Sequence, residues 1–527
     1  MPAKLLILGI DAASPTLLRR WANEGQLPAI RDLMARGVSG AVRGVKGFFI
    51  GSTWPSFYTG LSPAGHGFYR IEQLRSGTYD FYRPLEAPRG VGGTPFWRLA
   101  SDAGRRVAVL DVPLTRLDPG LNGVQIVEWG SHDAVFGFRA APPEIGRHIL
   151  SRVGAYPLPG PCDGVRRTAA DFARFVSGLE LAVARKTELT LDVLGREHWD
   201  LFIQVFTEAH CVGHQCWHIH DPEHPAHDPQ LRAAVGDPLE RVYRAIDRAV
   251  AATLDRAGDA HVLLVSPHGM SHYRGAGFLL PDILVRLDVT ARAPERQAVG
   301  RSAWAVARAA WQVLPDVARS SLRPLQVKVA AWRDADGQLP RLEAHVVTSR
   351  CFPIPNGSPV GGIRLNLVGR EPQGVLEPGS ETDAFCDALN GDLRGIIDER
   401  TGHPLVAEVY RTDALYAGAR RAALPDVLVE WTGDVPTGTL AHARGRGATV
   451  RARSPRIGVV EGTNAYGRTG DHVPTGTFVF AGPGVAATRR EEPVSLMDFH
   501  PTLCALMGLP DPDVDGALIP ELLAPRG

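Results

Sequence analysis

Short runs of apolar residues recur along most of the chain, separated by longer segments in which apolar residues follow a helical spacing. A strand that is covered on both faces is continuously apolar, so we interpret these runs as buried parallel strands. The predicted strands are Leu5–Ile10, Val107–Leu110, Leu201–Phe206, Val262–Val265, Val427–Glu430 and Thr477–Phe480.

Helices are predicted between these strands, at Pro15–Arg36, Asp171–Leu194 and Pro238–Arg256. Strands that alternate with helices are typical of an α/β fold with a doubly wound, mostly parallel sheet. The alternation breaks after Val285, where a basic amphipathic helix is predicted at Arg301–Val313, before a Pro- and Gly-rich stretch. We therefore predict two parts, a core made of residues 1–284 and 403–527 and an inserted cap made of residues 285–402.

Composition excludes several classes of protein. The 527 residues include 57 Lys and Arg and 57 Asp and Glu, so no net charge attracts nucleic acid or an anionic membrane. The six cysteines are scattered, which does not indicate a disulfide framework. No apolar run approaches the ~18 residues of a membrane helix, and the first run is too short for a secretory signal. We expect a cytoplasmic protein.

Candidate chemistry gathers where predicted strands end, which is where open parallel sheets bind ligands. Asp11 follows the first strand, where it could bind a cation or cap the helix that begins near Pro15. Ser52 and Thr53 precede Pro55, where another helix is predicted. A hydroxyl group there is either a nucleophile or an ordinary helix cap.

Histidines are concentrated after the strand Leu201–Phe206. His210, His214 and His218 are spaced by four residues and would share one face of a helix. Two imidazoles one turn apart can bind one Zn²⁺, and Glu208 could add a carboxylate or orient a ligand. Two later histidines, His224 and His227, are better interpreted as part of a solvated loop.

Two further segments contain metal-ligand types. His268 follows the strand Val262–Val265, with Gly269 and His272 close behind. Asp471 and His472 precede the strand Thr477–Phe480, where the alternative is a turn rich in Gly and Asp. The argument that Asp471 and His472 bind a metal depends mainly on the other candidate ligands.

The order of these motifs resembles the alkaline phosphatase superfamily, in particular its branch of type I phosphodiesterase/nucleotide pyrophosphatase-like enzymes. The resemblance rests on six segments in the family's order. They are the first strand ending in GID, Thr53 to Gly67, Glu208 to Pro225, HGM at His268, GGIRLNLVGREPQG at Gly361–Gly374 and GDHVPTGTFVFAGPG at Gly470–Gly484.

The resemblance implies a doubly wound α/β fold and two-metal phosphoryl transfer through a Thr nucleophile. Asp11, Thr53 and His268 would then bind one metal ion. The other would be bound by His210, His214 and His472. Thr53 would also be the nucleophile, with Ser52 as the fallback.

Two positions depart from the family pattern. Pro267 stands where the family has the Asp before HGM, and His210 stands where it has a second-site Asp. Because imidazole ligands favour Zn²⁺ and other borderline metals over Mg²⁺ or Ca²⁺, we expect zinc, with manganese as the alternative. The lost carboxylate leaves the expected number at one or two ions per chain.

The sequence therefore predicts a metal-dependent phosphoesterase that acts on a small-molecule phosphate mono- or diester, with no nucleic-acid or membrane partner. Arg364 and Arg370 are candidates for binding the substrate. The alternatives are a phosphomutase or phosphotransferase, and a single-metal or inactive binding variant of the same fold. A sulfatase is disfavoured, since its maturation signal would need Arg where Phe57 stands.

Overall fold

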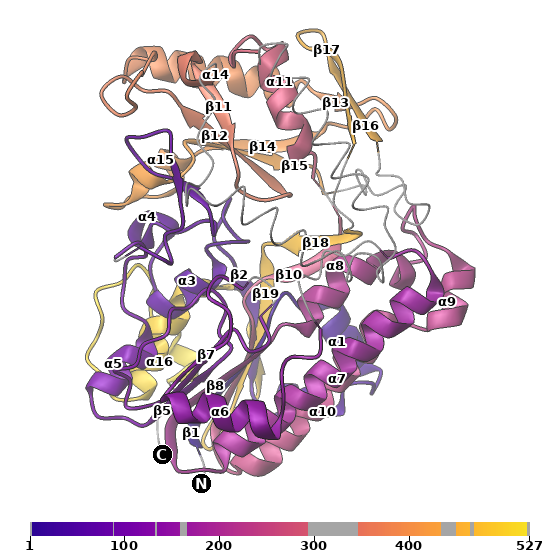
Figure 1. Cartoon of the computed structure of the whole chain (residues 1–527), viewed down its shortest axis with the longest axis vertical. Coiled ribbons are helices and arrows are strands. Elements are labelled where there is room, and N and C mark those ends of the chain that lie inside the picture. The colour runs from indigo at the N-terminus through magenta and orange to yellow at the C-terminus, as the bar shows by residue number, and fades with distance from the viewer. Residues whose placement is uncertain are drawn as a thin grey trace.

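A computed structural model describes residues 3–87, 89–131, 134–158, 166–273, 275–292, 346–433, 449–463 and 468–523. Figure 1 shows a lower part, in which helices cover both faces of one large sheet, and an upper part built around a smaller sheet.

The large sheet has ten strands, and the five at its centre are parallel. β21 (Val494–Ser495) pairs with β2 (Val38–Arg43), which also pairs with β20 (Thr488–Arg489), so β21 stands outside the linear order of the other strands. In spatial order the other strands are β20 (Thr488–Arg489), β2 (Val38–Arg43), β19 (Thr475–Ala481), β9 (His261–Ser266), β1 (Ala3–Ile10), β8 (Trp199–Phe206), β5 (Val107–Leu110), β6 (Gly123–Val127) and β7 (Arg139–Ala141).

Apolar side chains of each central strand alternate between two hydrophobic cores, as the pleat of a strand requires. In β1, Leu6 and Leu8 belong to one core, whereas Leu5 and Ile7 belong to the other. The first core is completed by α1 (Pro15–Asn23), α2 (Pro28–Arg36), α6 (Pro143–Arg152), α7 (Ala169–Leu194), α8 (Glu208–His220), α9 (Pro229–Val235) and α10 (Pro238–Ala257). The second is completed by α3 (Thr53–Thr59), α5 (Phe96–Asp102) and α16 (Phe499–Leu506).

The predicted α/β class and mostly parallel sheet are confirmed, with one change of direction. The apolar run Thr477–Phe480 lies in β19, which is antiparallel to both β9 and β2. The helix predicted at Pro15–Arg36 is two helices, α1 and α2. Gly25 lies between them with φ of 84°, a left-handed conformation that ends the first helix.

The second sheet is antiparallel and has four strands, β11 (Cys351–Ile354), β12 (Val360–Leu365), β15 (Val427–Trp431) and β14 (Val406–Arg411). The run Val427–Glu430 was predicted as a parallel strand of the core, and this is wrong. An apolar run indicates burial but not the partner strand. The sheet takes strands from both sides of residue 402, and the predicted domain limits stay a prediction.

Two helices and a small sheet complete the core of the upper part. They are α11 (Leu280–Arg286), α14 (Ser380–Arg394) and the strands β13 (Ile397–Asp398), β16 (Thr449–Ser454) and β17 (Gly458–Thr463). A separate cluster joins the upper part to the segment around α4 (Pro63–His66), where Phe48 and Tyr69 pack with Phe352 and Leu428. The helix predicted at Arg301–Val313 lies outside the described residues.

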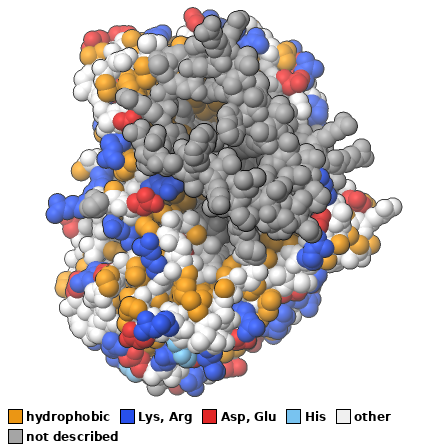
Figure 2. Space-filling model, viewed as in Figure 1, with side chains coloured by type: hydrophobic (Ala, Val, Ile, Leu, Met, Phe, Trp, Pro, Cys, Tyr) orange, Lys and Arg blue, Asp and Glu red, His pale blue; other side chains and the backbone are white. Residues whose placement is uncertain are grey.

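The described surface is mixed in charge. Figure 2 shows Lys and Arg side chains interspersed with Asp and Glu over the described part of one face. None of the described helices combines the length and the apolar character needed to span a bilayer. The five cysteines within the described ranges are buried and free.

Acid is expected to destabilise the fold through His66. Its ring is fully buried, and burial lowers its pKa to about 3, helped by the charge of Arg420. The unfolded chain therefore binds more protons than the folded chain between about pH 6.5 and pH 3, so stability falls as pH falls through this window, by up to about 1.4 kcal/mol per pH unit from this group.

The measurement is urea unfolding at several pH values. Phe68 N donates to His66 Nδ1 and Nε2 lies 2.9 Å from Ser56 Oγ, so the ring donates its Nε2 proton to the serine. His66→Gln can keep that bond without titrating. A variant with the same acid slope as the parent would show that His66 is not responsible.

Candidate active site

Hydrogen bonds join the loops that follow the central strands. The backbone N–H of Asp11, just beyond β1, donates to Phe206 O at the end of β8, at 2.8 Å. The N–H of Ala13 donates to Ser266 Oγ, the last residue of β9, at 3.0 Å. Ser266 Oγ donates in turn to His268 O at 2.9 Å. The residues predicted at three different strand ends are thereby held at one edge of the sheet.

A short two-stranded ribbon lies against α8 at this edge. It consists of β10 (Gly269–His272) and β18 (Gly470–Val473), which pair antiparallel with Met270 opposite His472. A Cβ at Gly470 would lie 2.2 Å from Gly213 O of α8, and one at Gly213 would lie 2.6 Å from Met270 Cγ. Only glycine at these two positions lets the helix and the ribbon approach so closely.

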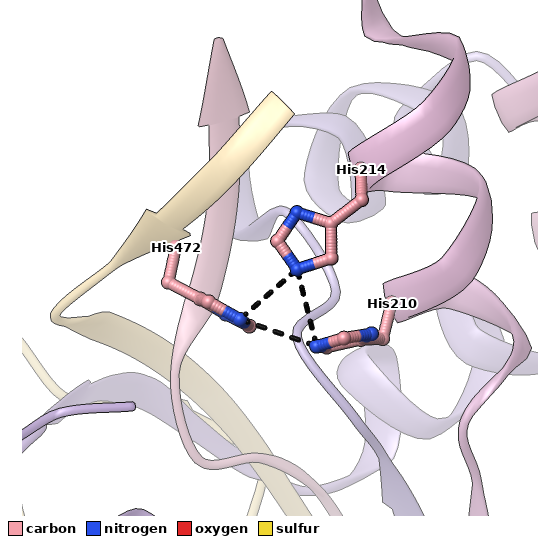
Figure 3. Close-up of side chains that lie close together, drawn as sticks. All are labelled: His210, His214 and His472. Carbon is pink, nitrogen blue, oxygen red and sulfur yellow. Dashed lines mark hydrogen bonds between the residues drawn. The ribbon is translucent and has the colours of Figure 1, made fainter. Parts of the chain in front are cut away.

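This close approach brings together three buried imidazoles (Figure 3). His210 and His214 lie one turn apart on α8, and His472 comes from β18. Their three Nε2 atoms are each 3.2 Å from the other two. Among the described residues, this is the one group of three or more such side chains whose candidate ligand atoms all lie within 4.8 Å of one another.

The spacing of the three nitrogens matches metal coordination. In a tetrahedral Zn²⁺ site with Zn–N bonds of about 2.05 Å, ligand nitrogens are about 3.3 Å apart. Three imidazoles would occupy three corners, and the fourth would be left for water or substrate, as in catalytic sites. The donor set is neutral and suits zinc better than Mg²⁺ or Ca²⁺.

The hydrogen bonds of His214 fix its tautomer. Its Nδ1 lies 2.7 Å from Gly470 O, and a carbonyl oxygen only accepts, so Nδ1 carries the proton. In the neutral ring Nε2 therefore has a lone pair that points into the cluster. Arg468 Nη1 lies 3.2 Å from this Nε2 and donates to it.

His268 adjoins the cluster but is not part of the compact group. Its ring centroid lies 4.7 Å from that of His472, with 30° between the planes. The structure thus brings four of the predicted metal ligands to one place: His210, His214, His268 and His472. Three of them meet through their Nε2 atoms.

The remaining predicted ligands make bonds of their own. Asp11 is buried, and its Oδ1 accepts a hydrogen bond from the indole of Trp54 at 2.8 Å. It does not cap α1, whose N-cap is Ser14. Thr53 Oγ1 donates to Phe49 O at 2.5 Å, and Ser52 Oγ donates to Phe68 O at 2.7 Å. Both hydroxyl groups are fully buried at the start of α3.

His218 shares the helix but not the cluster. It was predicted to lie on the same face as His210 and His214, yet its Nδ1 lies 3.0 Å from Thr469 Oγ1. His224 was predicted to lie in a solvated loop, but it is only 3% exposed, and burial lowers its pKa to about 4.

Glu208 orients no ligand of the cluster through a described contact and belongs instead to a buried ion network. Lys186 Nζ lies 3.1 Å from Glu208 Oε1 and 3.6 Å from Asp111 Oδ2. Tyr156 OH also donates to Glu208 Oε1. Burial disfavours the charged ammonium, but the two carboxylates raise the pKa of Lys186 above its usual value. The network fixes the start of α8, two residues before His210.

The two arginines predicted to bind substrate are bonded within the upper part. Arg364 is 1% exposed and donates to Glu371 through Nε and to two backbone carbonyl groups through Nη1. Arg370 donates to both oxygens of Asp426. These bonds favour a structural role for Arg364, and substrate binding by either residue stays a prediction.

Sequence reasoning did not identify three residues that shape the site. Lys186 is the one lysine of the predicted helix Asp171–Leu194, and a lysine on a helix usually faces solvent. Gly470 and Arg468 flank Thr469 in the segment that was recognised only for Asp471 and His472. The one signal was the glycine beside two candidate ligands, because glycine permits close backbone approach.

Fold and site together define an α/β protein with a candidate metal centre at the carboxyl edge of its sheet. Residues 5–343 match the family model of type I phosphodiesterase / nucleotide pyrophosphatase, so the chain belongs to this family of phosphoesterases. The predicted resemblance is thereby confirmed.

Two solved structures are similar to this chain at low identity. One is human ectonucleotide pyrophosphatase / phosphodiesterase 5, with 13% identity, a TM-score of 0.45, and coverage of 98% of this chain and 97% of that one. The other is an inactive form of the murine protein in complex with AMP, with 13% identity, a TM-score of 0.44 and the same coverage. No curated protein matches.

Proposed function

We propose that this protein hydrolyses a small phosphate ester with one tightly bound Zn²⁺ per chain, held by His210, His214 and His472. The observation that carries the proposal is the mutual 3.2 Å spacing of the three Nε2 atoms. Zn²⁺ held there would polarise the phosphoryl oxygens and lower the pKa of a bound hydroxyl group or water.

A second ion is less well supported by the residues of the other predicted site. Pro267 offers no ligand, and one oxygen of Asp11 already accepts a hydrogen bond from Trp54. The proposal therefore assigns one ion and not two. Asp11 and His268 are then polar groups beside the substrate.

Thr53 is the proposed nucleophile. In a helix a Thr side chain has two accessible χ1 wells, one of which bonds the carbonyl four residues earlier. The structure has this form, with the proton directed to Phe49 O. Rotation to the other well frees Oγ1 to attack phosphorus in line. The P–O bond to the ester alcohol breaks as the Oγ1–P bond forms, and the leaving oxygen takes up the hydroxyl proton, so an alcohol departs and a phosphothreonine remains. Water then breaks the Oγ1–P bond, which restores the Thr53 hydroxyl group and releases the phosphate product.

The test combines elemental analysis with turnover of aryl phosphate mono- and diesters by the same purified, tag-free protein. We expect about one equivalent of zinc together with turnover. Protein that binds no metal, even after zinc is added, and that hydrolyses neither ester would overturn the proposal.

Thr53→Ala is expected to lower turnover by at least about 1,000-fold, because a covalent nucleophile is lost. Zinc content should not change, since the three histidines remain. Ser52→Ala is the matched control, because it removes the neighbouring buried hydroxyl group and should leave turnover within a fewfold of the parent. Normal turnover by Thr53→Ala would exclude Thr53 as the nucleophile.

A further inference from the structure

The backbone next to the histidine cluster holds Arg468 in a fixed place. Thr469 N donates to His214 O at 2.7 Å, and Tyr273 N donates to Thr469 O at 2.7 Å. Thr469 Oγ1 also lies 3.0 Å from His218 Nδ1. Thr469 is thus bonded to α8 on one side and to the segment after β10 on the other. The backbone of Arg468, the preceding residue, is therefore held close to His214.

The guanidinium group donates to the atom that a metal would need. His214 Nδ1 is protonated because it bonds Gly470 O, so Nε2 has the only lone pair of the neutral ring. Arg468 Nη1 lies 3.2 Å from this Nε2. One lone pair serves either an N–H donor or a metal ion, and the guanidinium cannot lose its proton to become a ligand.

We propose that Arg468 and the metal ion compete for His214 Nε2, and that the displaced guanidinium then binds the phosphoryl oxygens of the substrate at the metal. This inference rests on the proposed function of the site. Without metal, Arg468 supplies positive charge beside the imidazoles. With metal bound, it would remain tethered beside His214, because Thr469 N donates to His214 O.

The chemistry of the displaced group fits a phosphate ester. A guanidinium is always charged and can donate two parallel hydrogen bonds to phosphate oxygens. Charge also develops on the equatorial oxygens during phosphoryl transfer, so a donor placed there stabilises the transition state. Arg468 would replace part of the positive charge that a second metal ion supplies elsewhere in two-metal enzymes.

Competition predicts changes of opposite sign in one variant. Arg468→Ala removes the competing donor, so zinc should bind the metal-free protein about tenfold more tightly, as measured by titration against a competing chelator. Inorganic phosphate should bind the zinc-loaded variant about ten- to a hundredfold more weakly, because a charged hydrogen bond is lost. Arg468→Lys should restore part of the phosphate affinity.

A purely structural arginine would behave differently. Its removal would weaken zinc and phosphate binding together, or change neither, and either result overturns the inference. Arg489→Ala is the matched control, since Arg489 is exposed on β20 and should affect neither affinity.

The experiment distinguishes failure of the proposed hydrolytic function from failure of this inference. If Arg468→Ala shows the two opposite shifts but the parent protein turns over no ester, the hydrolytic function fails and the inference stands. If the parent turns over esters but Arg468→Ala binds phosphate as tightly as the parent, the inference alone fails.

Discussion

Replacing Lys186 with methionine is expected to destabilise the protein by about 3–5 kcal/mol, because it leaves buried carboxylates without their cation. Lys186 and Glu208 are completely buried, and Asp111 is 2% exposed. Glu208 Oε2 accepts no hydrogen bond within the described part of the chain. The charge of the Glu208 carboxylate is therefore stabilised at Oε1, by the ammonium of Lys186 and the hydroxyl group of Tyr156. Urea unfolding measures the loss.

A surface lysine provides the matched control. Lys4 forms an ion pair of 2.8 Å with Asp200, but its side chain is 58% exposed. Water screens such a pair, and Lys4→Met should cost no more than about 1 kcal/mol. Equal losses for the two variants would contradict the buried-charge explanation.

The loss at Lys186 should also depend on pH in a defined direction. Burial already raises the pKa of Asp111 above its usual value, and loss of the nearby ammonium raises it further, so the folded variant keeps a proton to higher pH than the unfolded chain does. Its stability relative to the parent is then greatest at acid pH and falls as pH rises through the carboxyl range. A double change, Lys186→Met with Glu208→Gln, should recover part of the loss, because it removes one of the two buried carboxylates.

Replacing His214 with alanine is expected to weaken zinc binding by more than about 100-fold and to abolish turnover of phosphate esters. Loss of a group that merely orients a ligand costs about 10- to 100-fold in affinity, and His214 is itself a proposed ligand. The variant also loses the bond from Nδ1 to Gly470 O. Chelator competition and elemental analysis measure the effect.

His218→Asn is the control on the same helix. Its amide can replace the Nδ1 contact with Thr469 Oγ1 while the imidazole is removed. We expect zinc affinity to stay within a fewfold of the parent. An equal loss in both variants would mean that the helical spacing of four, and not the three-nitrogen cluster, identifies the ligands.

Periodicity predicted the part of the fold that depends on local pattern. The runs in β1, β5, β8 and β9 are buried on both faces, so their sequences are continuously apolar. The run in β15 has the same character but pairs in a different sheet, because the partner of a strand is decided by distant residues. The sequence therefore indicated buried strands and left their pairing undetermined.

For the candidate site, too, the sequence indicated types of side chain but not their partners. His210 and His472 could be identified because an imidazole at a strand end is a ligand type in a ligand position. His218 follows the same helical spacing, yet a hydroxyl group from another segment bonds it. Lys186 appears in sequence as one basic residue among many, and only the fold reveals that two carboxylates surround it.

The separation of the cluster along the chain has a consequence for biosynthesis. His210 and His472 are 262 residues apart, and the strand that carries His472 comes after the strands of the upper sheet. A ribosome-bound chain that has not yet released His472 offers at most the helical pair. The three-nitrogen site therefore forms only after the strands of the upper sheet have been synthesised, and a metal ion that needs all three nitrogens could bind only from that point on.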